Sequence, residues 1–295
     1  MALSYNINTS DAISFEDFVN NVSQKIDVER EESLIECVED IHKLSNNREF
    51  LLNILHRELL DIETLNKNNT YSAQTNILFK NEKFFIRANA WEPLSENEDK
   101  QKWQNELYFY GKAHDHNFSL LTVGYYGLGY ETEMWEYDHS KVVGEIGETV
   151  DMSFLERTTL PQGKAMIYRM SKDIHTQFAS KDYSISLNLI PKTRTGVRNE
   201  QFFFDTEKKT ITGLTSNDGT GRYFLLNLAG YYGNNTTLAL VENIAFNHKI
   251  PFIRMKSYDA MAKLTGNSKS IWELALEKDN NKIVTTYAKT CLDSL

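Results

Sequence analysis

The chain has 295 residues, 41% of them apolar and 12% aromatic, which is enough for a well-filled core and too aromatic for a disordered protein. Its formal net charge is −9 and it has no long basic block, so we expect no nucleic-acid partner. No apolar run is long enough to span a bilayer, and no basic segment leads into an apolar one at the start. We therefore expect neither a membrane partner nor a signal peptide.

The two cysteines, Cys37 and Cys291, stand near opposite ends of the chain. Neither belongs to a Cys-x-x-Cys pair, so they form no disulfide framework. This usage predicts two reduced thiols in a cytoplasmic protein.

Residues 1–69 are predicted to be helical. Ser14, followed by Glu16 and Asp17, is typical of a helix start, because a serine cap accepts backbone N–H groups and acids favour the first turn. Apolar residues then recur at helical spacing between residues 34 and 59. A polar stretch, Asn66–Thr70, ends this pattern.

Residues 70–213 have the texture of a β-domain. Short runs rich in aromatic and β-branched residues alternate with turn residues, which favours a sandwich or barrel over a parallel sheet. The predicted strands are Gln74–Phe79, Lys83–Ala90, His116–Gly124, Tyr130–Tyr137, Lys141–Val143, Lys164–Arg169, Tyr183–Ile190 and Gln201–Asp205.

Residues 214–295 return to helical patterns, with Pro251 and Gly266 as punctuation. The predicted helices are Arg222–Tyr231, Thr236–His248, Ser257–Leu264, Ser268–Glu277 and Lys282–Asp293. Together the three segments predict an α+β fold: a central antiparallel β-barrel or sandwich with helices at both ends that pack on it.

Two of the seven histidines, His114 and His116, stand two residues apart at the start of an apolar run. Side chains at this spacing on a strand point to the same face, so the pair aims two imidazoles at one point. Asp115, between them, is expected to point the other way, toward solvent. A metal on one ring nitrogen and a hydrogen bond on the other would satisfy such a pair inside a protein.

A third histidine, His175, follows the strand-like run 164–169. We expect its strand to run antiparallel beside the His-x-His strand and to bring the third imidazole across the barrel. No carboxylate closely follows the pair, which favours three histidines over two histidines and a carboxylate. Three protein ligands leave coordination positions open, as in catalytic metal sites.

The segment Ala113-His114-Asp115-His116 with its apolar strand, and then His175-Thr176-Gln177 followed by Ser184–Leu189, resembles the two metal-binding motifs of the cupin superfamily, in particular its thiol dioxygenase branch of the cysteine dioxygenase type. The resemblance spans residues 83–191. It implies a cupin barrel in which three histidines hold one Fe(II), and an enzyme that adds O2 to its substrate. By ligand type alone, Zn, Ni and Cu also suit three imidazoles.

The chain departs from that family where the family binds its substrate. No arginine occurs in residues 71–76, and Asn188 and Ile190 stand near the positions of the family's His and Tyr. A substrate other than cysteine is therefore expected.

Five further residues are candidates for the pocket around the metal. Arg87 could hold a carboxylate through a bidentate pair. Tyr168 and Arg169 precede the third histidine, and strand alternation turns one of them inward, where a tyrosine could act as an acid or hydrogen-bond donor. Gln177 and Asn188 are candidates for substrate contacts.

The sequence thus predicts an Fe(II)-dependent dioxygenase that acts on a small polar substrate, amino-acid-derived or a thiol. Two alternatives stay open. One is a metal-dependent cupin isomerase or lyase without O2 chemistry, and the other is a non-catalytic ligand-binding cupin. The oligomeric state cannot be read from the sequence.

Overall fold

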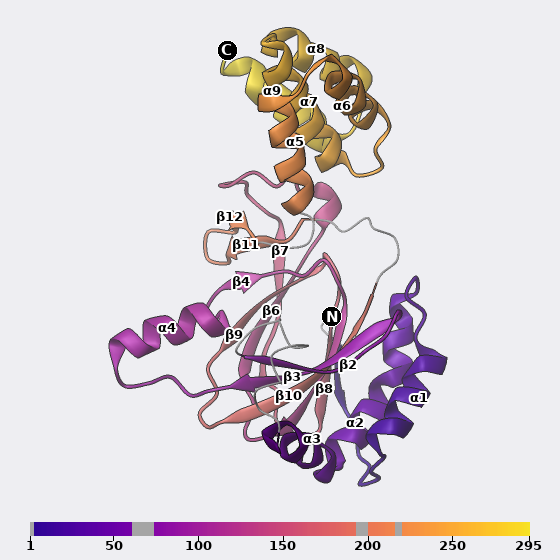
Figure 1. Ribbon diagram of the computed structural model, residues 1–295. Helices are drawn as coiled ribbons and strands as arrows, with labels where there is room; N and C mark the ends of the chain where they lie inside the picture. Colours follow the sequence, from indigo (N-terminus) through magenta and orange to yellow (C-terminus); the bar gives the residue numbers. More distant parts are fainter. Residues whose placement is uncertain (1–2, 61–73, 193–199, 216–219) are drawn as a thin grey trace. The chain divides into compact units, whose positions relative to one another are not determined.

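The computed structural model describes residues 3–60, 74–192, 200–215 and 220–295 (Figure 1). They form two compact units, Met1–Tyr137 with Met152–Gly196, and Asp138–Asp151 with Val197–Leu295. The predicted segment boundary at residue 69 lies outside the described residues, and the division into three segments, 1–69, 70–213 and 214–295, stays a prediction.

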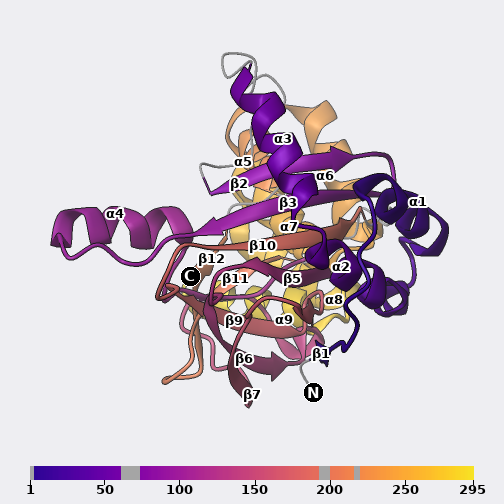
Figure 2. The same cartoon turned by 90° about the horizontal axis from the view of Figure 1, so that it is seen from below.

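The first unit is built on two antiparallel sheets (Figure 2). The order of the first sheet is β1 (Leu3–Asn6), β8 (Lys164–Tyr168), β5 (Leu120–Tyr126), β10 (Ser184–Pro191), β3 (Phe84–Trp91) and β2 (Thr75–Lys80). The second sheet brings together β4 (Ala113–His114), β9 (Asp173–Phe178), β6 (Glu131–Tyr137) and β7 (Met152–Thr159) in this unit. This sandwich confirms the predicted α+β class.

The N-terminal helices cover the outer face of the first sheet. Helix α1 (Phe15–Lys25) begins where Ser14 Oγ accepts the backbone N–H of Asp17 at 3.0 Å, as the sequence predicts. The 3₁₀ helix η1 (Glu31–Cys37), α2 (Val38–Asn46) and α3 (Glu49–Leu60) follow. Phe18 and Ile41 of this layer are fully buried in one core with Leu121 and Leu187 of the sheet.

Helix α4 (Glu98–Tyr108) projects from the edge of the first unit (Figures 1 and 2). The sequence pattern did not predict this helix, because its strongly polar composition gives little apolar periodicity. Asn97 caps it by accepting the N–H of Lys100 at 2.9 Å, and the chain leaves it at Phe109, whose φ is 57°.

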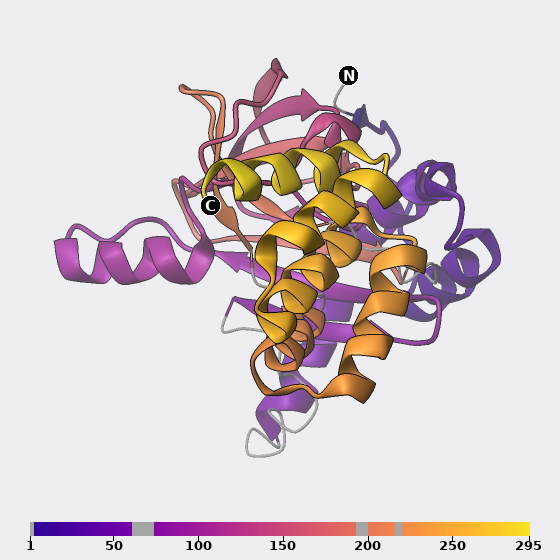
Figure 3. The ribbon, with the colours of Figure 1, turned by 90° about the horizontal axis from the view of Figure 1, so that it is seen from above.

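The second unit contains the 3₁₀ turn η3 (His139–Lys141), the hairpin β11 (Phe202–Asp205) and β12 (Thr210–Leu214), and five helices (Figure 3). These helices are α5 (Thr220–Tyr232), α6 (Asn235–Asn247), α7 (Pro251–Thr265), α8 (Ser268–Lys278) and α9 (Lys282–Asp293). Helix α7 is apolar on several sides because it packs against the other four. Pro251 begins it and Gly266, with φ of 67°, ends it.

One predicted strand is correct only in part, and another is wrong. The run His116–Gly124 is not one strand, because β4 ends at His114 in the second sheet and β5 begins only at Leu120 in the first. Residues 115–119 cross between the sheets. The run Lys141–Val143 begins with the last residue of η3 and is not a strand, since Asp138 caps the turn by accepting the N–H of Ser140.

Both cysteines are free thiols, with Cys37 buried and Cys291 half-buried. Among the residues that the structure describes, no helix combines the length and the apolarity needed to cross a bilayer.

Candidate metal centre

Three imidazoles converge inside the first unit. The ring centroids of His114 and His175 are 4.3 Å apart, those of His116 and His175 4.8 Å, and those of His114 and His116 5.1 Å. One ring nitrogen from each lies within 4.8 Å of the other two, and only histidines belong to this cluster among the described residues. The convergence predicted from the spacing is therefore present.

Strand pairing places these rings. Strand β4 runs antiparallel to β9 with His114 directly opposite His175, and directly opposed residues on neighbouring strands point to one face. His116 lies just beyond β4, where its carbonyl oxygen accepts the N–H of Ser171 at 2.7 Å. Phe118 stacks on its ring, with centroids 4.5 Å apart and planes 18° from parallel.

The environment keeps the three rings neutral. Burial lowers the pKa of His114, and burial together with the neighbouring His114 and Arg87 lowers the pKa of His116 well below 6.5. Burial and the other two histidines lower the pKa of His175 well below 6.5 as well. Neutral imidazole is the form that binds a metal ion.

The hydrogen bonds of the rings fit a metal ligand set. Nδ1 of His114 lies 2.9 Å from the carbonyl oxygen of Lys112 and must donate to it, so its lone pair is on Nε2. Nδ1 of His175 is buried and has no hydrogen-bond partner. A buried polar atom without a partner is costly, and an ion among the three rings removes this kind of cost. The residues present therefore fit a metal ion.

Asp115 does not face solvent, which corrects the sequence-based expectation. It is fully buried, and its carboxylate accepts the hydroxyl of Tyr137 at 2.7 Å. Because the chain turns from one sheet to the other directly after Asp115, the side opposite the histidines is also protein interior. This hydrogen bond anchors the residue between His114 and His116.

The first sheet turns a polar row toward the interior. Asn188 of β10 is directly opposite Arg87 of β3 on one side and Thr122 of β5 on the other. All three are buried, and their strand neighbours Leu121 and Leu187 point to the helix-covered face. The charge of Arg87 contributes to the low pKa of His116, so the two predicted substrate residues Arg87 and Asn188 lie on the face toward the histidines.

Tyr168 points inward beside the cluster. Its ring centroid lies 4.7 Å from that of His175, and its hydroxyl is 3.1 Å from the hydroxyl of Tyr130. Burial raises the pKa of Tyr168 well above 10, and Tyr130 adds to this shift. Gln177 shares the strand face of His175 and lies close enough to Tyr130 to influence its pKa.

Arg169 is held by carboxylates. Its guanidinium pairs with Asp173 at 2.5 Å and with Glu136 at 2.6 Å. Since it follows Tyr168, alternation directs the two side chains differently, and the tyrosine has the inward position. A direct catalytic role for Arg169 stays a prediction.

Three residues of this centre were missed by the sequence analysis: Tyr130, Thr122 and Tyr137. Tyr130 begins a predicted strand but was not among the residues that we expected around the metal. Alternation with Thr132 and Met134, both fully buried, would have indicated an inward direction. Tyr137, the partner of Asp115, gives no such signal in the sequence. The two residues come together only because β6 and β4 both pair with β9.

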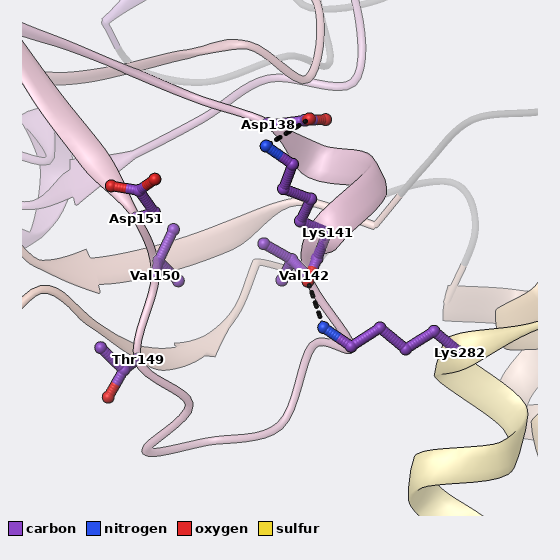
Figure 4. A pocket seen from close by; sticks show the side chains of 7 residues that line it. All are labelled: Asp138, Lys141, Val142, Thr149, Val150, Asp151 and Lys282. Atoms are coloured by element: carbon purple, nitrogen blue, oxygen red, sulfur yellow. Dashed lines mark hydrogen bonds and ion pairs between the residues drawn. The ribbon is translucent and has the colours of Figure 1, made fainter.

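The second unit has a small pocket of its own, with a volume of about 220 Å³ (Figure 4). It contains no histidine. Lys141 reaches Asp138 at 3.4 Å, and the ammonium of Lys282 donates to the carbonyl oxygen of Lys141 at 3.4 Å. Its lining residues are Asp138, Lys141, Val142, Thr149, Val150, Asp151 and Lys282.

No protein-family model matches the chain, and no curated protein matches it. Among solved structures it is similar to a hydroquinone 1,2-dioxygenase in complex with Cd²⁺ and 4-hydroxybenzonitrile, with 11% identity, a TM-score of 0.28, and coverage of 43% of this chain and 69% of that chain. A cupin domain from Bordetella pertussis shows 14% identity, a TM-score of 0.22 and coverage of 41% and 94%. A salicylate 1,2-dioxygenase from Pseudoaminobacter salicylatoxidans shows 10% identity, a TM-score of 0.26 and coverage of 49% and 32%.

Proposed function

We propose that the chain is a mononuclear metal-dependent oxygenase, with His114, His116 and His175 as the ligands of one Fe(II). The observation that carries the proposal is the convergence of three neutral imidazoles, those of His114 and His175 buried and that of His116 half-buried, which face a polar layer of the opposite sheet. His114, His116 and His175 would hold the ion, which when bound would supply the activation of O2 toward a small polar substrate. Three-histidine ligation by itself suits Zn, Ni or Cu too, and iron enters the proposal through the resemblance to thiol dioxygenases.

The chain's own residues supply binding and orientation. Arg87 is a buried cation, and a guanidinium binds a carboxylate through two parallel hydrogen bonds. We assign it the anionic group of the substrate. Asn188, beside it on β10, and Gln177, two residues after His175, offer amide donors and acceptors to the rest of the molecule.

Tyr168 is the proton-holding group of the proposed site. With a pKa well above 10, its phenol is protonated at neutral pH and donates a hydrogen bond rather than accepting a proton. The hydroxyl of Tyr130 at 3.1 Å fixes its direction. Tyr168 can therefore hold a proton beside His175, and it is itself packed in an apolar cluster with Met134 and Met166.

The second candidate function is an isomerase or lyase with the metal as Lewis acid. The protonated state of Tyr168 favours this function too. A protonated tyrosine next to the histidines serves general acid catalysis without any oxidant. The third candidate function is that of a ligand-binding protein without catalytic activity.

The experiment starts from protein purified without a His-tag and reconstituted with Fe(II) under anaerobic conditions. We expect one metal ion per chain in the wild type. His175→Ala should bind the metal more than about 100-fold more weakly, because the loss of a mere hydrogen-bond partner of a ligand already weakens binding by about 10–100-fold. His56→Ala should bind the metal like the wild type, because the side chain of His56 is exposed on α3. Unchanged metal content in His175→Ala would contradict the ligand assignment.

Oxygen uptake separates the candidates. Admission of O2 to the loaded protein with a panel of amino-acid-derived acids and thiols should give substrate-dependent uptake. If metal binds and the panel is converted without O2 consumption, the Lewis-acid function holds instead. Substoichiometric metal that is insensitive to His114→Ala would leave only the binding protein.

A further inference from the structure

The turn between β8 and β9, residues 169–172, touches both parts of the histidine cluster. It leads directly into the strand that carries His175. The backbone N–H of Ser171 donates to the carbonyl oxygen of His116 at 2.7 Å, and the N–H of Met170 donates to Ser119 Oγ at 2.9 Å. Ser119 in turn donates to Glu31. The turn thus joins the loop of His116 to the strand of His175.

A charged cluster fixes the shape of this turn. Asp173 accepts the backbone N–H of Arg169 at 2.7 Å and pairs with its guanidinium at 2.5 and 3.1 Å. The same guanidinium reaches Glu136 on β6 at 2.6 Å. The side chain of Asp173 is 0% exposed and that of Arg169 only 12%, so each charge depends on the other.

The turn is also conformationally unusual. Ser171 has φ of 51°, a left-handed conformation that non-glycine residues adopt only when their surroundings hold them there. Ser171 is also the residue whose N–H holds His116. A change in the turn therefore moves the backbone of His116 relative to β9.

We infer that Arg169 is a positioning residue of the metal centre: it holds the β8–β9 turn so that His116 and His175 keep the separation that a single ion requires. The inference rests on the proposed metal site. It makes Arg169 act through Asp173 and Ser171 without touching metal or substrate. Such outer partners are worth 10–100-fold in metal affinity in other sites.

The chain offers a matched control. Arg157 of β7 also pairs with two carboxylates, at 2.8 Å from Glu131 and 2.8 Å from Glu133, both on β6. Its side chain is 51% exposed, and its two partners lie on the strand face opposite Thr132 and Met134. The two arginines thus have similar ion pairs, but of the two only Arg169 belongs to the β8–β9 turn that holds the backbone of His116.

The test measures Co(II) binding by the full chain. For wild type, Arg169→Gln, Arg169→Lys and Arg157→Gln, the dissociation constant comes from competition with a chelator, and the visible ligand-field absorption of bound Co(II) reports coordination geometry. We expect about 10–100-fold weaker binding and an altered spectrum in Arg169→Gln, partial recovery of both in Arg169→Lys, and wild-type behaviour in Arg157→Gln. Thermal unfolding of the metal-free variants provides the comparison of stability.

The outcomes separate this inference from the proposed function. If the wild type takes up no Co(II), the metal centre itself is wrong. If the wild type binds Co(II) and Arg169→Gln keeps both its affinity and its spectrum, the centre stands and the positioning role is overturned. If Arg169→Gln does not fold, Glu136→Gln removes only the more exposed partner, whose side chain is 33% exposed, and we expect a few-fold weaker binding with a shifted spectrum. Unchanged values in that variant would equally overturn the inference.

Discussion

The two faces of the sheet β1-β8-β5-β10-β3-β2 are made from the same strands and differ in chemistry. One face carries Leu121, Val123, Leu187 and Leu189, all fully buried under the N-terminal helices. The other carries Thr122, Arg87 and Asn188, also buried, and looks toward the three histidines. Since successive side chains on a strand alternate between faces, residues next to each other in sequence take part in different tasks.

The difference separates stability from function. Burial of the apolar face is the main favourable contribution to folding, at roughly 25 cal/mol per Å² of apolar surface. Burial of a guanidinium, an amide and a hydroxyl costs free energy unless each finds partners. Arg87, Asn188 and Thr122 are buried nonetheless, and they lie on the face that looks toward a cluster of potential metal ligands.

The largest effect that sharpens this comparison is expected from Leu121→Ala. Leu121 is fully buried in the core beneath the helices, so the substitution removes apolar contacts and leaves a cavity. We expect the free energy of unfolding to fall by about 2–5 kcal/mol, measured by urea denaturation. The affinity for Co(II) should stay within about twofold, because the side chain points away from the histidines. A large loss of metal affinity in the folded variant would show that the two faces are coupled.

The alternation behind this prediction could be obtained from the sequence. On β5, strand alternation alone places Leu121 and Val123 on one face and Thr122 on the other, and the His-x-His spacing together with His175 indicated the convergence of three rings. These features follow from local geometry, which a single strand determines.

Other features depend on pairings that no local pattern contains. The break after His114 arises because β4 pairs with β9 in one sheet while β5 pairs with β8 and β10 in the other. Strand β7 was missed because most of its side chains are exposed or half-buried and little apolar alternation marks an edge strand of this kind. The partners of Asp115 and Arg169 likewise come from another strand or from the far end of a turn.

An intermediate effect is expected from acid on the metal-free protein. The pKa values of His114, His116 and His175 are depressed in the folded state, mainly by burial, whereas in the unfolded chain they take the ordinary value near 6.5. Below that pH the unfolded state binds protons that the folded state does not. Stability that is fully present above pH 6.5 is therefore lost as the pH falls, by up to about 1.4 kcal/mol per pH unit for each histidine.

Urea unfolding at pH 7.5 and pH 5.5 measures this loss. The replacement of one ring, His175→Gln, should reduce the pH dependence of stability, whereas His56→Gln on the exposed side of α3 should preserve it. The side chain of Leu121 does not titrate, so Leu121→Ala should lower stability equally at both pH values. If His175→Gln retains the full pH dependence, His175 is not held neutral in the folded protein.

The smallest effect on the free energy of unfolding is expected from a substitution of Thr122, the residue after Leu121 on β5. Its hydroxyl oxygen is fully buried and makes no hydrogen bond of standard geometry, although it lies close enough to Tyr130 to lower the pKa of that phenol. Thr122→Val keeps the shape and removes the hydroxyl, so we expect the free energy of unfolding to rise by about 1 kcal/mol. The same change should weaken substrate binding while Co(II) affinity is unchanged, because the hydroxyl lies in the row beside Asn188 and Arg87 and not among the ligands. Adjacent substitutions on β5 would then move stability in opposite directions, which is the outcome that a sheet with one structural and one functional face requires. A loss of stability in Thr122→Val would mean that the polar row is itself part of what holds the fold together.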